Sequence, residues 1–155
     1  MSQSAKILRA LVATLALSMV AGCAQQASPP PQAAAATGPE LAGAWYRIYF
    51  DTNSSAIDAR GQMIVKNVAY VVANIASTRV TVIGKTDRVG APPANMALSH
   101  RRADAIRDAL IAAGVPAGRI DTSWTGEGKQ QVATANEVAE SRNRVVDVTV
   151  VKESP

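Results

Sequence analysis

The sequence predicts a two-layer α+β sandwich, with a mixed four-stranded sheet and its helices on one face. Segments with apolar residues at alternate positions are interleaved with segments whose apolar residues recur at helical spacing, in the order β-α-β-α-β-(α)-β. Strands joined through helices pair in parallel with right-handed crossovers, which places both helices on the same face. The 155 residues suffice for one domain with a substantial core, and hardly for two.

The first strand, helix and second strand follow from a change in apolar spacing. Residues 45–50 (WYRIYF) are aromatic and β-branched, which is typical of a strand. The polar run 51–55 (DTNSS) suits a turn and a helix N-cap. Residues 56–77 repeat apolar side chains at helical spacing, and residues 80–83 form a short apolar strand.

The second helix is expected at residues 99–113, after a polar loop that contains Gly90 and two prolines. Its expected first turn holds Arg101 and Arg102, although the helix dipole prefers acids there by about 0.3–1 kcal/mol. Such breaks of a local rule often lie at functional sites, and helix N–H groups with a guanidinium bind a carboxylate well. Alternatively, both arginines are solvated or pair with nearby acids such as Asp104.

The remaining segments complete the sheet. Residues 120–125 and 144–151 are predicted as the third and last strands, with a short helix expected near 134–141. By alternation along the last strand, Asp147 falls on the face away from the core, so we expect it to be solvated.

Asp87 is a candidate binding residue because it follows the second strand by only a few positions. Loops at the carboxyl ends of strands are favoured ligand positions. An aspartate there can hold an ammonium group while an arginine holds a carboxylate, so the two together would recognise a zwitterion. The alternative is a turn-forming aspartate that bonds its own backbone.

The N-terminus is predicted to be a targeting segment. Lys6 and Arg9 precede the apolar stretch 10–20, which is shorter than the roughly 20 residues that span a bilayer, as in a secretory signal peptide. Residues 20–23 (VAGC) resemble the lipobox of bacterial lipoproteins, which implies cleavage after a signal peptide at 1–22 and acylation (palmitate) of Cys23. Several acyl chains give stable membrane anchoring. The alternative is an ordinary exported protein with an incidental cysteine.

A spacer is expected to follow the anchor. Ala24 rather than aspartate follows the cysteine, so the lipobox resemblance implies sorting to the cell outer membrane, with the domain facing the periplasm. Residues 23–43 are the acylated cysteine and an Ala/Pro-rich tether, which spans at most about 66 Å extended and about 25 Å as a coil. Residues 44–152 are the predicted folded domain.

Composition excludes several classes of function. One Cys rules out an intramolecular disulfide framework and multi-cysteine metal sites, and one His argues against a histidine metal cluster, so no metal or cofactor is expected. The formal charge of +4 falls by two when the signal segment is removed, and there is no basic run. With only six aromatic residues as well, no nucleic-acid interface is expected.

Four motifs in order resemble the OmpA-like C-terminal peptidoglycan-binding domain of bacterial envelope proteins, on a lipoprotein of Pal-like architecture. The family pattern is strand-FD, G-H-T-D-x-x-G, N-x-x-L-S-x-x-R-A and N-R-R-V. This chain has Phe50-Asp51, Gly84-Lys85-Thr86-Asp87-Arg88-Val89-Gly90, Asn95-Met96-Ala97-Leu98-Ser99-His100-Arg101-Arg102-Ala103 and Asn143-Arg144-Val145-Val146. The resemblance covers roughly residues 45–151.

The resemblance implies a non-catalytic site for the diaminopimelate of the peptidoglycan stem peptide. Asp87 would hold its ammonium group, and Arg102 would hold its carboxylate in a bidentate fork. Asn53 and Asn95 match family residues that assist, and Thr86 belongs to the same T-D motif. Arg102 is expected at an exposed helix start.

The chain departs from the family pattern at two positions. Lys85 replaces the family histidine, and Val145 replaces the second arginine of N-R-R-V. A ligand role for Arg144 is therefore less well supported, and the alternative is a structural pair with a helix acid. Glu127 is expected to be structural, and no role is assigned to His100.

Three functions remain open. The first is a tether between the outer membrane and the cell wall. The second is a periplasmic adaptor or assembly lipoprotein whose main partner is another envelope protein. The third is a peptidoglycan enzyme that uses Asp51 and Asp87 as an acid/base pair. A motor stator is disfavoured because no membrane-spanning segment is expected in the mature chain.

Overall fold

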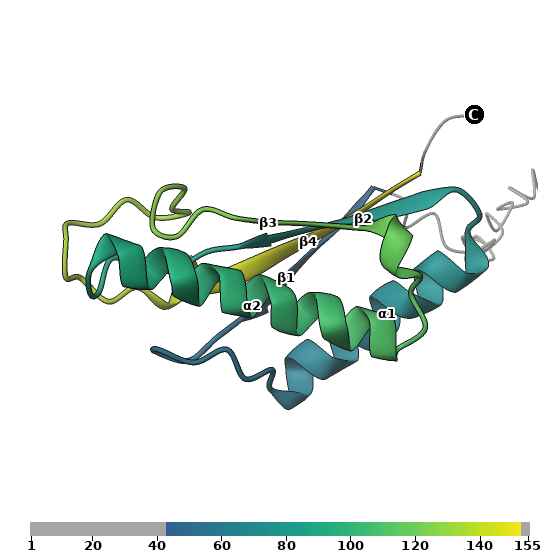
Figure 1. The fold of residues 1–155 in the computed structure, drawn as a ribbon, viewed down its shortest axis with the longest axis horizontal. Coiled ribbons are helices and arrows are strands. Elements are labelled where there is room, and N and C mark those ends of the chain that lie inside the picture. The colour runs from purple at the N-terminus through teal and green to yellow at the C-terminus, as the bar shows by residue number, and fades with distance from the viewer. Residues whose placement is uncertain (1–42, 153–155) are drawn as a thin grey trace, which may run out of the picture. The chain divides into compact units, whose positions relative to one another are not determined.

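The computed structural model describes residues 43–152, so the predicted signal peptide, lipobox and tether lie outside the described residues. Its four strands are β1 (Ala44–Tyr49), β2 (Thr78–Gly84), β3 (Ile120–Trp124) and β4 (Val145–Lys152). They form one sheet in the order β1-β4-β2-β3 (Figure 1). β4 pairs antiparallel with β1 and β2, whereas β2 and β3 are parallel. The expected mixed four-stranded sheet is confirmed.

Two helices, α1 (Ala59–Asn74) and α2 (Pro92–Ala112), lie side by side on the same face of this sheet (Figure 1). Asp58 caps α1, because its Oδ1 accepts a 2.6 Å hydrogen bond from the Gly61 backbone N–H. The helices and the sheet enclose an aliphatic core. Its fully covered members include Ile48, Val68, Val80, Val82, Ala103, Ile106, Leu110, Val146, Val148 and Val150.

β2 and α2 approach closely at the position where β2 ends. Gly84 lies beneath the helix, and a side-chain Cβ there would overlap the backbone carbonyl oxygen of Ser99. The glycine is therefore required by packing. This contact fixes the end of β2, and hence the start of the loop that carries Asp87, against the helix.

The start of the second helix was predicted wrongly. α2 begins at Pro92, seven residues before the expected Ser99, with prolines at its first positions. Proline is tolerated in a first turn because no intrahelical partner is required for its missing N–H. Arg101 and Arg102 therefore lie inside the helix, and the argument from unsatisfied N–H groups at a helix start does not apply to them.

The short helix expected near residues 134–141 is also absent. The segment that joins β3 to β4 is irregular apart from a 3₁₀ turn at Ser141–Asn143. The buried Asn143 side chain holds the segment together, since its Oδ1 accepts hydrogen bonds from the Gln131 and Val132 backbone N–H groups, both at 2.9 Å. Within the expected helix, Glu137 has a φ of +61° and donates its backbone N–H to the Arg88 carbonyl at 2.8 Å, which is incompatible with a continuous helix.

Asp147 is buried rather than solvated, being only 3% exposed. Its carboxylate lies 2.6 Å from Lys85 Nζ on one side and 3.5 Å from Arg47 Nε on the other. Arg47 lies on β1 and Lys85 directly follows β2, and these two strands are the neighbours of β4. Alternation placed Asp147 on the correct face, but it could not show that two paired cations cover it.

Candidate ligand-binding site

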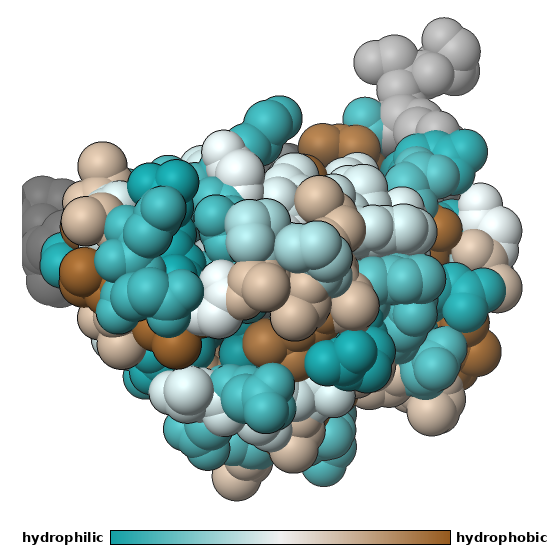
Figure 2. All heavy atoms as spheres, turned by 60° about the vertical axis from the view of Figure 1, so that its left-hand side comes forward, coloured by the Kyte–Doolittle hydropathy of each residue, from teal (hydrophilic) through white to brown (hydrophobic). Residues whose placement is uncertain are grey.

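A hollow of about 360 Å³ lies at the end of the domain where α2 begins. Three segments line it: the β1–α1 loop (Thr52, Asn53), the β2–α2 loop (Asp87, Val89, Gly90) and the first turns of α2 (Ala94, Asn95, Ala97, Leu98, Arg101). This end of the domain is at the left in Figure 1 and faces the viewer more directly in Figure 2, where it is largely hydrophilic with small apolar areas. Three of the predicted site residues, Asn53, Asp87 and Asn95, meet here.

Asp87 is held in place with one carboxylate oxygen left unused. The residue is 5% exposed. Its Oδ2 accepts hydrogen bonds from Arg144 Nη1 at 3.0 Å and from the Glu140 backbone N–H at 3.3 Å. Its Oδ1 accepts none from the residues that the structure describes. A carboxylate fixed in this way can accept a hydrogen bond from a cationic ligand group without first being ordered.

Arg144 is the structural partner of Asp87, an acid of the β2–α2 loop and not the helix acid that was expected. Besides the ion pair with Asp87, its Nε donates to the Phe50 carbonyl oxygen at 3.1 Å. Arg144 thus connects the end of β1 with the β2–α2 loop.

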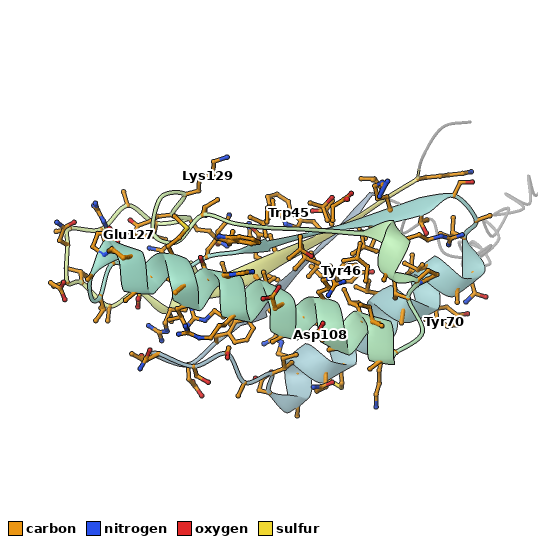
Figure 3. The ribbon with its side chains drawn as sticks, viewed as in Figure 1. Trp45, Tyr46, Tyr70, Asp108, Glu127 and Lys129 are labelled. Atoms are coloured by element: carbon orange, nitrogen blue, oxygen red, sulfur yellow. The ribbon has the colours of Figure 1, made fainter. Side chains whose placement is uncertain are left out.

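The two asparagines differ in their surroundings. Asn53 is exposed and has a φ of +51°, a left-handed conformation that asparagine adopts more readily than most residues. Asn95 is 4% exposed, and its Nδ2 donates to Glu127 Oε2 at 2.7 Å and to the Gly90 carbonyl at 3.3 Å. Figure 3 shows Glu127 beside the start of α2. Asn95 and Glu127 therefore hold the rim of the hollow together.

The structure corrects the expected exposure of Arg102, which is completely buried and does not line the hollow. Its guanidinium donates to three backbone carbonyls: Nε to Ser54 at 2.8 Å, Nη2 to Asp51 at 2.9 Å and Nη1 to Lys85 at 3.0 Å. It thereby joins the β1–α1 loop to the end of β2. These partners are far away in the sequence, which is why no local pattern predicted them.

The electrostatics of Arg102 reflect this burial. Removal from water lowers the pKa of its guanidinium from its ordinary value to about 10, and Arg144 and Arg101 contribute in the same direction, while the negative charge of Asp87 opposes the change. An arginine with this pKa remains charged at neutral pH. Arg102 and Asp87 thus supply buried charges of opposite sign at one end of the domain.

Arg101 is the site residue that sequence reasoning missed. It is exposed, lines the hollow and forms no ion pair with a described residue, whereas Asp104 pairs with His100 at 3.2 Å. Helical spacing could have found it if the helix start had been placed correctly. In a helix that begins at Pro92, Arg102 shares the buried face with Leu98, and Arg101 falls outside it.

Thr86 is buried but does not line the hollow. Its backbone N–H donates to Gly126 at 2.9 Å, and its Oγ1 has no hydrogen-bond partner among the described residues. Of the two departures from the family pattern, Val145 begins β4 and Lys85 directly follows β2. Lys85 pairs with Asp147, and Val145 is completely buried.

The carboxylates proposed as an acid/base pair do not share one hollow. Asp87 lines the hollow described above, whereas Asp51 lines a separate one. Among residues 43–152, no group of three or more His, Cys, Asp or Glu side chains is arranged to hold a metal ion. Within the same range, no helix has the length and apolar character needed to cross a bilayer.

Comparison with known proteins gives a family. Residues 49–145 match the model of the OmpA family, and the chain belongs to that family. Membership of this non-catalytic family confirms the expectation that the domain is not an enzyme.

Curated relatives include two lipoproteins that align at 35% identity. The "Probable lipoprotein YiaD" of Escherichia coli (strain K12) aligns over 103 residues, 66% of this chain and 47% of YiaD. The "Peptidoglycan-associated lipoprotein" of Rhizobium meliloti (strain 1021) aligns over 144 residues, 86% of this chain and 80% of that protein. The first three curated relatives are each aligned over less than two thirds of their own length.

Solved structures agree on the fold. The peptidoglycan-associated lipoprotein from Burkholderia pseudomallei superposes with a TM-score of 0.63 and 26% identity, covering 67% of this chain and 88% of that one. The C-terminal domain of Helicobacter pylori MotB superposes with a TM-score of 0.60 at 20% identity, covering 70% of this chain and 86% of that one, a similarity of fold alone.

Proposed function

We propose that the domain binds peptidoglycan without catalysis, through the diaminopimelate of the stem peptide. The observation that carries the proposal is the fixed carboxylate of Asp87 in a hollow that also has an arginine at its edge. Opposite charges on two sides of one hollow suit a ligand that carries an ammonium and a carboxylate within one short chain. The relatives named peptidoglycan-associated lipoproteins support the same ligand class.

Each side chain has a role in this proposal. Asp87 Oδ1 accepts from the ammonium group, and Asn53 and Asn95 contact the amides of the stem peptide. Arg101 reaches the carboxylate from the rim. Thr86 fixes the backbone beside Asp87.

Arg102 acts from beneath the hollow. A guanidinium has five N–H donors, and the three backbone carbonyls leave one N–H on each Nη atom of Arg102 without a partner among the described residues. In this proposal the buried charge of Arg102 favours an anionic group in the hollow, and the two remaining N–H groups are the donors that a ligand carboxylate would take in a fork.

Co-sedimentation with purified sacculi tests the proposal. Residues 24–155, which contain the whole described domain, are mixed with sacculi with and without excess meso-diaminopimelate. We expect sedimentation that the free amino acid reverses. If the folded protein stays in the supernatant, peptidoglycan binding is wrong, and the adaptor function with a protein partner becomes the better account.

We further propose that Cys23 is acylated after removal of residues 1–22, so that the domain tethers the outer membrane to the wall. The relatives named lipoproteins support this anchoring. In cell fractionation, we expect a Cys23→Ala variant to be absent from the membrane fraction. Its folded domain is expected to bind sacculi still. Retention of this variant in the outer membrane would contradict acylation at Cys23.

A further inference from the structure

A second hollow, of about 410 Å³, lies on the other side of the β1–α1 loop and has no part in the proposed diaminopimelate site. Its lining includes Tyr49, Phe50, Asp51, Asp58, Arg142 and Arg144. The strand end, the helix N-cap and the turn before β4 therefore contribute to it together.

The two hollows are neighbours. Asp87 lines the first, Arg144 lines the second, and the ion pair between them, 3.0 Å long, forms a shared wall. The chain from Phe50 to Asn53 also passes from one to the other, since Phe50 and Asp51 line the second hollow while Thr52 and Asn53 line the first. A ligand that extends beyond the first hollow on this side enters the second.

The carboxylates and the guanidinium groups of the second hollow all keep hydrogen-bonding capacity. Arg142 gives two of its five N–H donors to Glu140, at 3.0 and 2.8 Å, and Arg144 gives one to Asp87 and one to the Phe50 carbonyl. The Asp51 carboxylate accepts no hydrogen bond from the described residues, and Asp58 uses only Oδ1, for the α1 cap. Each guanidinium group is already paired with another carboxylate, Glu140 or Asp87, so Asp51 and Asp58 give the hollow an excess of negative charge that disfavours an anion. It suits a ligand without negative charge that has several hydroxyl or amide groups.

Tyr49 adds an apolar surface, since this residue of β1 is 42% exposed. An aromatic ring beside unused carboxylate oxygens matches a pyranose sugar, which has an apolar C–H face and hydroxyl groups around its edge. We propose that the second hollow binds a sugar of the glycan strand that carries the stem peptide. This inference rests on the proposed function, because the peptide in the first hollow is what brings the sugar to the second.

Two soluble ligands distinguish binding in the first hollow from binding in the second. The first is the stem tetrapeptide that contains meso-diaminopimelate, and the second is the same peptide linked to its N-acetylglucosamine–N-acetylmuramic acid disaccharide. Binding of each to residues 24–155 is measured by isothermal titration calorimetry. We expect the disaccharide-linked peptide to bind roughly three- to tenfold more tightly, the range that one aromatic contact supplies.

Variants test which side chains cause the higher affinity for the disaccharide-linked peptide. Tyr49→Ala is expected to abolish the difference between the two ligands and to leave the affinity for the tetrapeptide unchanged. Asp58→Asn keeps the helix cap, because asparagine caps as well as aspartate, and is expected to reduce the difference. Tyr70→Ala is the matched control, since Tyr70 is 63% exposed on α1 and lies at the opposite end of the domain from Glu127 (Figure 3).

The outcomes are distinguishable. Equal affinity of the wild-type protein for both ligands would overturn the sugar site and leave the peptide site standing. Failure of both ligands to bind would overturn the proposed function itself. If Tyr49→Ala weakened both ligands equally, Tyr49 would belong to the peptide site, and the sugar site would be wrong.

Discussion

Arg101 and Arg102 are adjacent in sequence and opposite in environment. One guanidinium lies at the rim of the hollow, and the other is covered on all sides and bonded to three carbonyls of two distant segments. The two side chains should therefore respond differently to the same substitution.

We expect Arg102→Gln to lower the free energy of unfolding by about 3 kcal/mol, because three buried carbonyls lose a charged donor and the cavity is not filled. Urea denaturation measures the change. Arg107→Gln, which alters an exposed pair with Asp108 on the same helix, is the control and should change stability by less than about 0.5 kcal/mol. Equal stability of the Arg102→Gln variant and the wild type would refute a structural role for this guanidinium.

Arg101→Gln should leave stability within about 0.5 kcal/mol of the wild type, because the side chain is exposed and has no ion pair among the described residues. Binding to sacculi should weaken by about tenfold or more, the value of one charge-assisted hydrogen bond. Sedimentation at graded sacculus concentrations measures the loss. Undiminished binding would remove Arg101 from the site.

Sequence reasoning was most useful for residues whose role is set by a motif, and least useful for residues whose role is set by burial. The motifs predicted Asp87, Asn53 and Asn95 as site residues, and these three residues line one hollow. The burial of Arg102 and Asp147 depends on partners from other segments, which periodicity along one element does not include.

At the scale of elements, the turn before β4 supports the site. Glu140 donates its backbone N–H to Asp87 and accepts from Arg142 with its side chain. Hydrogen bonds and charge from Arg142 lower the pKa of Glu140 from 4.5 to about 2. A carboxyl whose pKa is lowered by folding stabilises the folded state above its ordinary pKa, and this contribution is lost as the pH falls from about 4.5 towards 2.

Arg142→Gln is therefore expected to return the pKa of Glu140 towards 4.5, as measured by NMR titration of its side-chain carboxyl carbon. The variant should lose the Glu140 contribution to acid stability at a higher pH than the wild type. An unchanged titration would show that Arg142 is not the cause of the shift.

Gly84→Ala tests the contact between β2 and α2. A methyl group at this position overlaps the Ser99 carbonyl, so the helix and strand must separate. We expect stability to fall by about 1–3 kcal/mol, as for other overpacked sites, and sacculus binding to weaken because the loop with Asp87 begins here. Gly118→Ala is the control, since nothing lies within 4 Å of its Cβ position. A fully stable Gly84→Ala variant would contradict the close approach.

Alternating and helical spacings were sufficient to place the two long helices and the four strands, but not all of their ends. The two prolines were interpreted as loop residues, although their missing N–H groups cost nothing in a first helical turn. The expected helix near residues 134–141 is interrupted at Glu137, which has a φ of +61° and donates its backbone N–H to the Arg88 carbonyl of another loop.

At the scale of the whole molecule, sheet topology explains why the sites lie where they do. β1 and β2 are parallel, with β4 between them in the opposite direction. The loops that leave β1 and β2 therefore emerge at the same end, where the chain also enters β4. Sequence reasoning predicted the mixed sheet and its layers, whereas the side chains that cross between these loops emerged only from the three-dimensional arrangement.

The central claim is that a zwitterionic amino acid binds between the loops after β1 and β2. The most direct measurement is an NMR titration of ¹⁵N-labelled residues 24–155 with meso-diaminopimelate. We predict that backbone amide signals shift saturably at residues 52–53, 87–90 and 94–101, and that an Asp87→Asn variant loses these shifts while keeping its fold. Saturable shifts confined to other parts of the domain, or none in a folded wild-type protein, would contradict the account.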